Sequence, residues 1–237
     1  MARNRTPEGS ADEPGRRTPP AARTPSAGRT PPVARTPRGS YAVGDERRQR
    51  ILDTAVDHFG RWGFHAASLA RIAKDVGITQ GGLLHHFPSK EDLLLHVLER
   101  ADAGDREGFV AHEFESAAEM FSMLVRLAER DTARVGQARL FNVLVAEAGD
   151  PGHPAHAYVA HRYAELVEVM AGVLRQAAHA GELRPDTDAG AVAVAQEVAA
   201  VLDGLRIQWV LDPRGFDLAG RFRAYVERVL RALSVDR

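Results

Sequence analysis

Hydrophobic residues recur every three or four positions from Asp45 onward, which is the period of an amphipathic α-helix. The first run carries Ile51, Ala55, Phe59 and Trp62 on one face and predicts a helix of about 17 residues. Two glycines near its end predict where this helix stops.

A shorter run follows, and its spacing predicts a helix-turn-helix unit. Ser68 offers an N-cap to a helix with an apolar face over Leu69–Val76. Gly77 supplies the turn, and residues 79–87 form a second short helix that Pro88 terminates. In such a unit the second helix lies in the major groove of DNA. The alternative is that residues 79–87 form a loop.

Two adjacent glycines, Gly81 and Gly82, lie inside the predicted second helix. Each costs about 1 kcal/mol relative to alanine in a helix interior. A helix that only packs seldom tolerates such a pair, whereas a backbone that approaches DNA closely can use it.

The rest of the chain continues in helices. A capping box at Ser89 opens one of them. Further helices are predicted over 109–129 and 132–148, from Pro154 to near Gly181, around 194–209 and over 218–233. Because no convincing strand pattern occurs, the sequence predicts an all-α fold.

Composition narrows the class of protein. Of the 237 residues, 44% are hydrophobic and 27% are charged, which is typical of a globular protein with a sizeable core. The absence of cysteine excludes disulfide scaffolds, thiolate zinc sites and cysteine nucleophiles. No apolar run approaches the roughly 20 residues of a membrane span, and no secretory signal is present. We therefore expect a cytoplasmic protein with no membrane partner.

Residues 1–43 are predicted to be a disordered tail. Residues 1–40 hold eight of the 13 prolines and eight arginines against three acids, and Arg-Thr-Pro recurs every six residues from Arg17 to Arg35. Such a segment cannot bury enough apolar surface to fold. Two interpretations stay open: low-complexity drift, including a start assigned too early, or a mobile basic arm that follows DNA phosphates.

Residues 46–100 resemble the tetracycline-repressor (TetR) family of transcriptional regulators, of the actinobacterial type. The motif runs from Ser68 as Ser-Leu-Ala-Arg-Ile-Ala-Lys-Asp-Val-Gly-Ile-Thr-Gln-Gly-Gly-Leu-Leu-His-His-Phe-Pro-Ser-Lys-Glu-Asp-Leu-Leu. The resemblance implies a three-helix DNA-binding domain over 44–104, with the helix-turn-helix at about 68–87. The family usually has tyrosine where this chain has Leu84, so one phosphate contact is lost or passes to His85.

The resemblance also implies which residues bind DNA. Gln80 is the candidate base reader, because a carboxamide pairs with adenine through two hydrogen bonds. Lys90 matches a phosphate-contacting lysine of the family. Thr79 either caps its helix or touches DNA, and packing is the favoured role of His86. The full set is Arg47, Arg48, Ser68, Thr79, Gln80, Gly81, Gly82, His85, His86 and Lys90.

Residues 105–237 are expected to form a regulatory and dimerisation domain. In the family the last two helices of each subunit build an intersubunit four-helix bundle, so a homodimer binds a palindromic operator. An unknown small-molecule effector is expected to shift the protein toward a form that fits DNA poorly. Aromatic or polar-tipped residues of the core helices are the candidate pocket, with ordinary core packing as the alternative. They are Phe141, Tyr158, Tyr163, Gln208 and Trp209.

A sequence-specific repressor competes with other functions. An activator of the same fold stays open, because the reading helix does not reveal promoter geometry. His153, His156 and His161 could serve a metal-responsive regulator, but a loop and a helix would have to converge, so we expect no metal and no cofactor. Neither a nucleophile elbow nor a Walker A motif occurs, and we expect no enzyme. Residues 101–237 carry six more acids than bases, which argues against an architectural DNA-binding protein.

Overall fold

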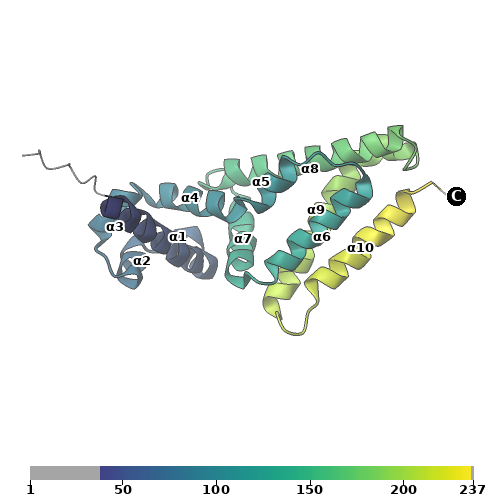
Figure 1. The fold of residues 1–237 in the computed structure, drawn as a ribbon. Coiled ribbons are helices and arrows are strands. Elements are labelled where there is room, and N and C mark those ends of the chain that lie inside the picture. The colour runs from purple at the N-terminus through teal and green to yellow at the C-terminus, as the bar shows by residue number, and fades with distance from the viewer. Residues whose placement is uncertain (1–37, 236–237) are drawn as a thin grey trace, which may run out of the picture. The chain divides into compact units, whose positions relative to one another are not determined.

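The computed structural model describes residues 38–235, apart from the side chains of residues 38–43 and 105. Within that range the chain forms ten helices and no strand, which confirms the predicted all-α class (Figure 1). Most of the predicted tail, residues 1–37, lies outside the described residues. The first helix starts at Arg38, inside the range 1–43 that the sequence assigns to the tail.

The first four helices form one bundle around a shared core. They are α1 (Arg38–Ala66), α2 (Leu69–Val76), α3 (Gln80–His86) and α4 (Lys90–Asp102). Their core is built from large apolar residues that are almost completely buried: Ile51, Phe59, Ile72, Leu83, Phe87, Leu93 and Leu94. These positions recur at helical spacing along each segment, which is why the sequence pattern finds the helices.

Two glycines shape this bundle. Gly77 follows α2 with a φ of +80°, the left-handed conformation that ends a helix and turns the chain toward α3. Gly63 has a φ of +71° and interrupts the helical geometry within α1. A Cβ at Gly63 would collide with the Glu147 carboxylate, which accepts the next N–H, that of Phe64, at 2.8 Å.

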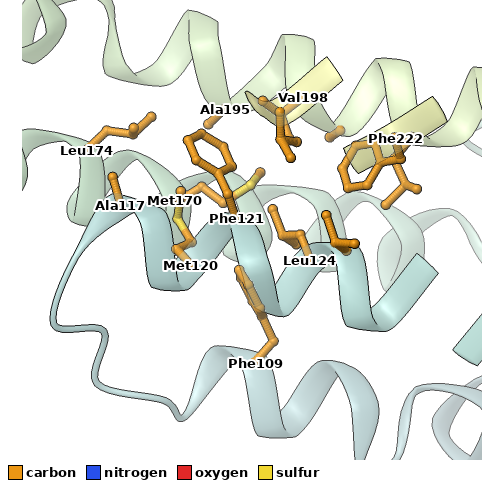
Figure 2. Close-up of a cluster of buried hydrophobic side chains, with 14 of the residues drawn as sticks. Phe109, Ala117, Met120, Phe121, Leu124, Met170, Leu174, Ala195, Val198 and Phe222 are labelled. Carbon is orange, nitrogen blue, oxygen red and sulfur yellow. The ribbon is translucent and has the colours of Figure 1, made fainter. Parts of the chain in front are cut away.

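The remaining six helices surround a second core. They are α5 (Asp105–Val110), α6 (Ala117–Asp131), α7 (Val135–Glu147), α8 (His156–His179), α9 (Asp186–Leu211) and α10 (Leu218–Leu233). α8 packs along α9, while α6 packs against both α8 and α10. Figure 2 shows the core between them, where Phe121 and Leu124 of α6 meet Met170 of α8, Val198 of α9 and Phe222 of α10.

The prediction of one helix over 109–129 is wrong. The chain leaves helical structure after Val110 and restarts at Ala117, because Ser116 caps α6. The Ser116 hydroxyl accepts the Glu119 N–H at 3.1 Å, and the Glu119 carboxylate accepts the Glu115 N–H at 2.8 Å. This reciprocal capping box satisfies backbone donors that a continuous helix would bond elsewhere, and apolar spacing alone does not reveal it.

Helix α7 joins the two cores. It packs closely along α1, and its Leu140 and Leu144 are buried among the core residues of the first four helices. The bundle of the first four helices and the following helices therefore share apolar surface within residues 38–235.

Candidate DNA-binding surface and effector cavity

The N-terminus of α3 presents polar side chains to solvent. Thr79 occupies the N-cap, and its hydroxyl accepts the Gly82 N–H at 3.0 Å, which is the capping role considered from the sequence. Gln80 follows as the first residue of the helix and is exposed. Its carboxamide is therefore free to reach the edges of base pairs.

The two glycines of α3 have different surroundings. A Cβ at Gly82 would lie 3.3 Å from Thr79 Oγ1, so the cap favours glycine at this position. At Gly81 the nearest atom would be the same oxygen at 3.9 Å, and the residue is exposed. Packing within residues 38–235 therefore accounts for Gly82 but not for Gly81.

Two predicted phosphate-binding cations are held by their neighbours. Arg48 donates a hydrogen bond to the His86 carbonyl at 3.1 Å, and its guanidinium lies 4.2 Å from the centre of the Phe87 ring. Lys90 donates to the His65 carbonyl at 3.0 Å, and burial lowers the pKa of its ammonium. Each contact leaves further N–H groups for phosphate, and it fixes where the charge points.

The histidine pair at the end of α3 is asymmetric. His85 is exposed, whereas His86 is half-buried. Burial lowers the pKa of His86, and the electrostatic effect of the nearby His85, Arg47 and Arg48 lowers it further. The part of α1 that carries Arg47 and Arg48 therefore lies beside the end of α3.

Ser68 differs from its predicted role. It occupies the N-cap of α2, but its hydroxyl makes no capping hydrogen bond in the structure described over 38–235. The side chain is exposed, so its hydroxyl remains available to another partner, such as a DNA phosphate.

A cavity of about 100 Å³ lies among α4 to α9. Its apolar walls include Phe109, Leu124, Leu127 and Leu166. Its polar walls are three aspartates, three arginines, a glutamine and a tyrosine: Asp102, Asp131, Asp203, Arg106, Arg162, Arg206, Gln137 and Tyr163.

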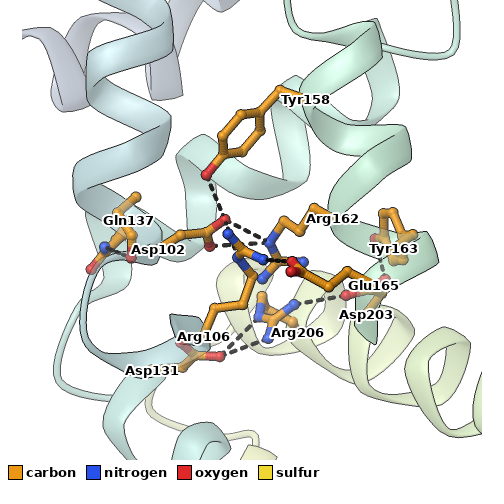
Figure 3. A network of polar contacts seen from close by, with 11 residues as sticks. Asp102, Arg106, Asp131, Gln137, Tyr158, Arg162, Tyr163, Glu165, Asp203 and Arg206 are labelled. Atoms are coloured by element: carbon orange, nitrogen blue, oxygen red, sulfur yellow. Dashed lines mark hydrogen bonds and ion pairs between the residues drawn. The ribbon is translucent and has the colours of Figure 1, made fainter. Parts of the chain in front are cut away.

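Asp102, the last residue of α4, is the centre of one polar cluster in this cavity (Figure 3). Its side chain is buried, and its carboxylate accepts the Tyr158 hydroxyl at 2.7 Å. The same carboxylate accepts Nε of Arg162 at 3.0 Å and Nε of Arg106 at 3.1 Å. The end of α4 is thereby tied to α8 by charge-assisted hydrogen bonds.

Arg206 of α9 is the centre of the second cluster. Only 8% of the residue is exposed, and its guanidinium donates to Asp131 at 2.8 and 3.0 Å and to Asp203 at 2.7 Å. The Tyr163 hydroxyl also donates to Asp203. Burial, followed by the adjacent carboxylate, raises the pKa of Tyr163 well above its usual value, so this phenol stays a donor.

The predicted pocket residues take different positions. Phe141 and Tyr163 line the cavity, and Tyr158 reaches it through Asp102. Trp209 instead belongs to the buried core. Gln208 is exposed and donates to the Gly204 carbonyl one turn back, so the structure places it outside the cavity.

Sequence reasoning missed the charged walls of the cavity. Asp102 with Arg106 and Asp203 with Arg206 are pairs at helical spacings of four and three, and that spacing is the only local signal they leave. Arg162 carries no such signal, because its partner Asp102 lies 60 positions away in the sequence.

The three histidines of the metal alternative have separate surroundings. His153 is buried and accepts the Ala155 N–H, His156 donates to the Ala148 carbonyl, and His161 is exposed. Among the side chains that the structure describes, no group of three His, Cys, Asp or Glu residues could hold a metal ion. The alternative therefore finds no support. In the same part of the chain, no helix has the length and apolarity needed to cross a bilayer.

Comparison with known protein families gives two matches. Residues 51–97 match the model described as "Bacterial regulatory proteins, tetR family". Residues 117–235 match the model described as "BetI-type transcriptional repressor, C-terminal". The two matches cover the helix-turn-helix and all five helices that follow α5 in the part of the chain that the structure describes.

Individual relatives agree with these models. The transcriptional regulator UidR of Escherichia coli K12 is 34% identical over 143 residues, which are 59% of this chain and 70% of UidR. A transcriptional regulator from Saccharomonospora viridis, solved in complex with choline, is 26% identical with a TM-score of 0.65, covering 81% of this chain and all of its own. SCO4454, a TetR-family regulator from Streptomyces coelicolor, is 28% identical with a TM-score of 0.63, covering 81% of this chain and 97% of its own.

Proposed function

This chain belongs to the TetR family of bacterial regulatory proteins, and from that premise we propose that it is a homodimeric repressor whose operator affinity a small molecule controls. Residues 44–104 are its DNA-binding domain and residues 105–237 its regulatory and dimerisation domain. One observation carries the proposal: α4 starts beside the recognition helix and ends, at Asp102, in the wall of the cavity.

The DNA-binding surface reads bases through α3 and positions itself through the flanking helices. Gln80 reads the base edges, and Gly81 lets the helix backbone approach the groove. Arg47, Arg48, Ser68 and Lys90 contact phosphates on either side. His85 is exposed and adds a contact near Leu84, whereas Thr79, Gly82 and His86 mainly shape the helix that carries Gln80.

Helix α4 couples ligand binding in the cavity to DNA binding. A ligand that competes for Arg162 or Arg106 takes hydrogen bonds away from Asp102 and weakens the tie between α4 and α8. Because α4 also packs against α1, its displacement changes the position of the DNA-binding bundle. The ligand thus favours a second conformation by binding it more tightly. The choline complex of the relative from Saccharomonospora viridis supports a small-molecule effector as a class.

The dimer is expected to form through α9 and α10. A stripe of mostly apolar or small residues follows α9 at helical spacing: Val192, Gln196, Ala200, Gly204, Ile207 and Leu211. Within this stripe Gln196 is polar and Gly204 is half-buried, and the other four are apolar and exposed. Ile207 is 50% exposed and Leu211 is 81% exposed, and a Cβ at Gly204 would meet nothing within 4 Å. Exposed apolar surface of this kind is favourable to bury against a second copy.

The proposed function is tested by fluorescence anisotropy on DNA upstream of the protein's own gene, with non-specific competitor at physiological salt. We expect saturable binding by a dimer, and repression of a reporter placed behind the same DNA. Binding that is equal on scrambled DNA would contradict sequence-specific regulation, and activation of the reporter would contradict repression.

Gln80→Ala tests the base reader. We expect it to lose about 1–3 kcal/mol on the cognate operator and much less on scrambled DNA, because one base contact is removed. Gln176→Ala, which removes an exposed carboxamide of α8, is the matched control and should bind like the wild type. Equal weakening of Gln80→Ala on every sequence would show that Gln80 does not read bases.

A further inference from the structure

We propose that the cavity among α4 to α9 binds a small organic carboxylate. This inference rests on the proposed function only in treating the cavity as the effector site. The cavity is lined by three guanidinium and three carboxylate groups, so its formal charge is balanced before a ligand enters. The ligand class therefore follows from which hydrogen-bonding groups remain free and how the aromatic faces are used.

The free donors belong mainly to two arginines. Arg162 uses only Nε toward Asp102, and Arg106 uses Nε and Nη1 toward Asp102 and Glu165. Among the side chains that the structure describes, none bonds to Nη1 or Nη2 of Arg162 or to Nη2 of Arg106. Both side chains line the cavity, and less than a fifth of each is exposed. A guanidinium with free terminal nitrogens matches the two oxygens of a carboxylate.

Two of the three carboxylates of the cavity, Asp102 and Asp203, use both of their oxygens, whereas Asp131 uses only Oδ2, for Arg206. Both oxygens of Asp102 accept from Arg162, and one of them also accepts from Tyr158 and Arg106. Both oxygens of Asp203 accept as well, from Tyr163 and Arg206. A cationic ligand would have to displace these arginines to pair with Asp102 or Asp203, and of the three carboxylates only Asp131 could take a cation without such a displacement.

The aromatic faces of the cavity carry cations from the protein itself. The Arg162 guanidinium lies 4.1 Å from the centre of the Phe141 ring and 6.0 Å from that of Tyr163. Arg206 lies 5.7 Å from the Phe141 ring. A quaternary ammonium binds through such faces, so here it would compete with arginines that are already in place.

The volume and the apolar walls of the cavity limit the size and shape of the ligand. About 100 Å³ is well below the roughly 300–1,000 Å³ of a pocket for a drug-sized molecule. Phe109, Leu124 and Leu166 also line the cavity and give it apolar surface. The matching ligand has one carboxylate and a short aliphatic chain or a single ring.

The test is calorimetric titration of the full chain, without DNA, with acetate, butyrate, hexanoate and benzoate, each paired with its neutral amide, and with choline chloride. Ionic strength is held constant. We expect at least one carboxylate to bind about tenfold more tightly than both its amide and choline. Choline as the tightest probe, equal binding of acid and amide, or no binding by any carboxylate would overturn the proposal.

Substitutions of the two arginines, Arg162 and Arg106, test whether the carboxylate binds in this cavity. Arg162→Gln should weaken the best carboxylate by about tenfold or more, and Arg162→Lys should weaken it less, because lysine keeps the charge but lacks the fork. Arg175→Gln, elsewhere on α8, is the matched control and should not change binding. If thermal unfolding shows that Arg162→Gln is misfolded, Arg162→Lys and Arg106→Gln carry the comparison, and unchanged affinity in both overturns the site. Operator binding is measured separately, so a protein that binds the carboxylate but no DNA contradicts the regulator and not the ligand class.

Discussion

At the scale of single residues, a substitution of Gly81 is expected to raise the stability of the protein and to weaken its binding to DNA. Its position is open and exposed within a helix, so Gly81→Ala should raise the free energy of unfolding by about 0.5–1 kcal/mol. The added methyl group would stand between the α3 backbone and DNA, and we expect about tenfold weaker operator binding. Thermal unfolding and anisotropy measure the two effects.

Gly172→Ala is the control for this substitution. Gly172 is exposed inside α8, and a Cβ there would meet nothing within 4 Å. It should gain similar stability with unchanged DNA binding. Unchanged operator affinity in Gly81→Ala would contradict close backbone approach.

The buried imidazole of His153 leads to a prediction of how the free energy of unfolding depends on pH. Burial lowers the pKa of its imidazole, and the nearby His65 lowers it further, while Glu147 opposes the shift. The unfolded chain binds this proton near pH 6.5 and the folded chain only at lower pH. The free energy of unfolding should therefore fall as pH drops below about 6.5, toward the lowered pKa of the folded state.

His153→Gln should reduce that slope between pH 7 and pH 5, measured by urea unfolding. Some slope should remain, because burial also lowers the pKa of His86. His161→Gln, an exposed position on α8, serves as the control. A slope in His153→Gln as steep as in the wild type would show that His153 does not carry this effect.

At the scale of helices, the buried hydrogen bonds between Asp102 of α4 and Arg162 of α8 predict that a substitution of Asp102 strongly lowers the free energy of unfolding. Asp102→Asn removes a buried negative charge that pairs with two arginines, and it should lower the free energy of unfolding by about 3–5 kcal/mol. Asp53→Asn breaks the exposed pair with Arg100 and should cost less than about 1 kcal/mol. Urea titration compares the two variants, and similar small losses would refute a buried tie.

The starts of two helices, at Ser89 and Ser116, differ in whether the sequence analysis predicted them. The Ser89 cap, whose hydroxyl accepts the Asp92 N–H at 3.0 Å, is found where the sequence predicts it. The break before Ala117 is missed, because the apolar spacing of residues 109–129 continues through it. Both helices begin with a serine whose hydroxyl accepts the N–H three residues later. The second signal was therefore present in the sequence, but the apolar periodicity outweighed it.

At the scale of the whole molecule, the stripe on α9 predicts the assembly. Ile207→Glu should give monomers in light scattering and lose high-affinity operator binding, because two half-sites then no longer act together. Ala160→Glu adds the same charge at an exposed position of α8 and should remain dimeric. Dimers of Ile207→Glu would place the interface elsewhere.

The sequence by itself predicted most of the helices, the helix-turn-helix and the place of Gln80 at the start of its second helix. Helical spacing, caps and turn glycines depend on residues at most four positions apart, so they can be recognised in the sequence. The resemblance of residues 46–100 added the family.

Only the tertiary structure decided which polar groups meet in the cavity. Asp102, Arg162 and Arg206 come from α4, α8 and α9, and their partners lie up to 75 positions away. Helix packing sets such pairs, and each arginine or aspartate alone looks like a solvent-exposed charge. The same packing turned Gln208 outward and buried Trp209 in the core, although the two are neighbours in the sequence, because adjacent residues of a helix point about 100° apart.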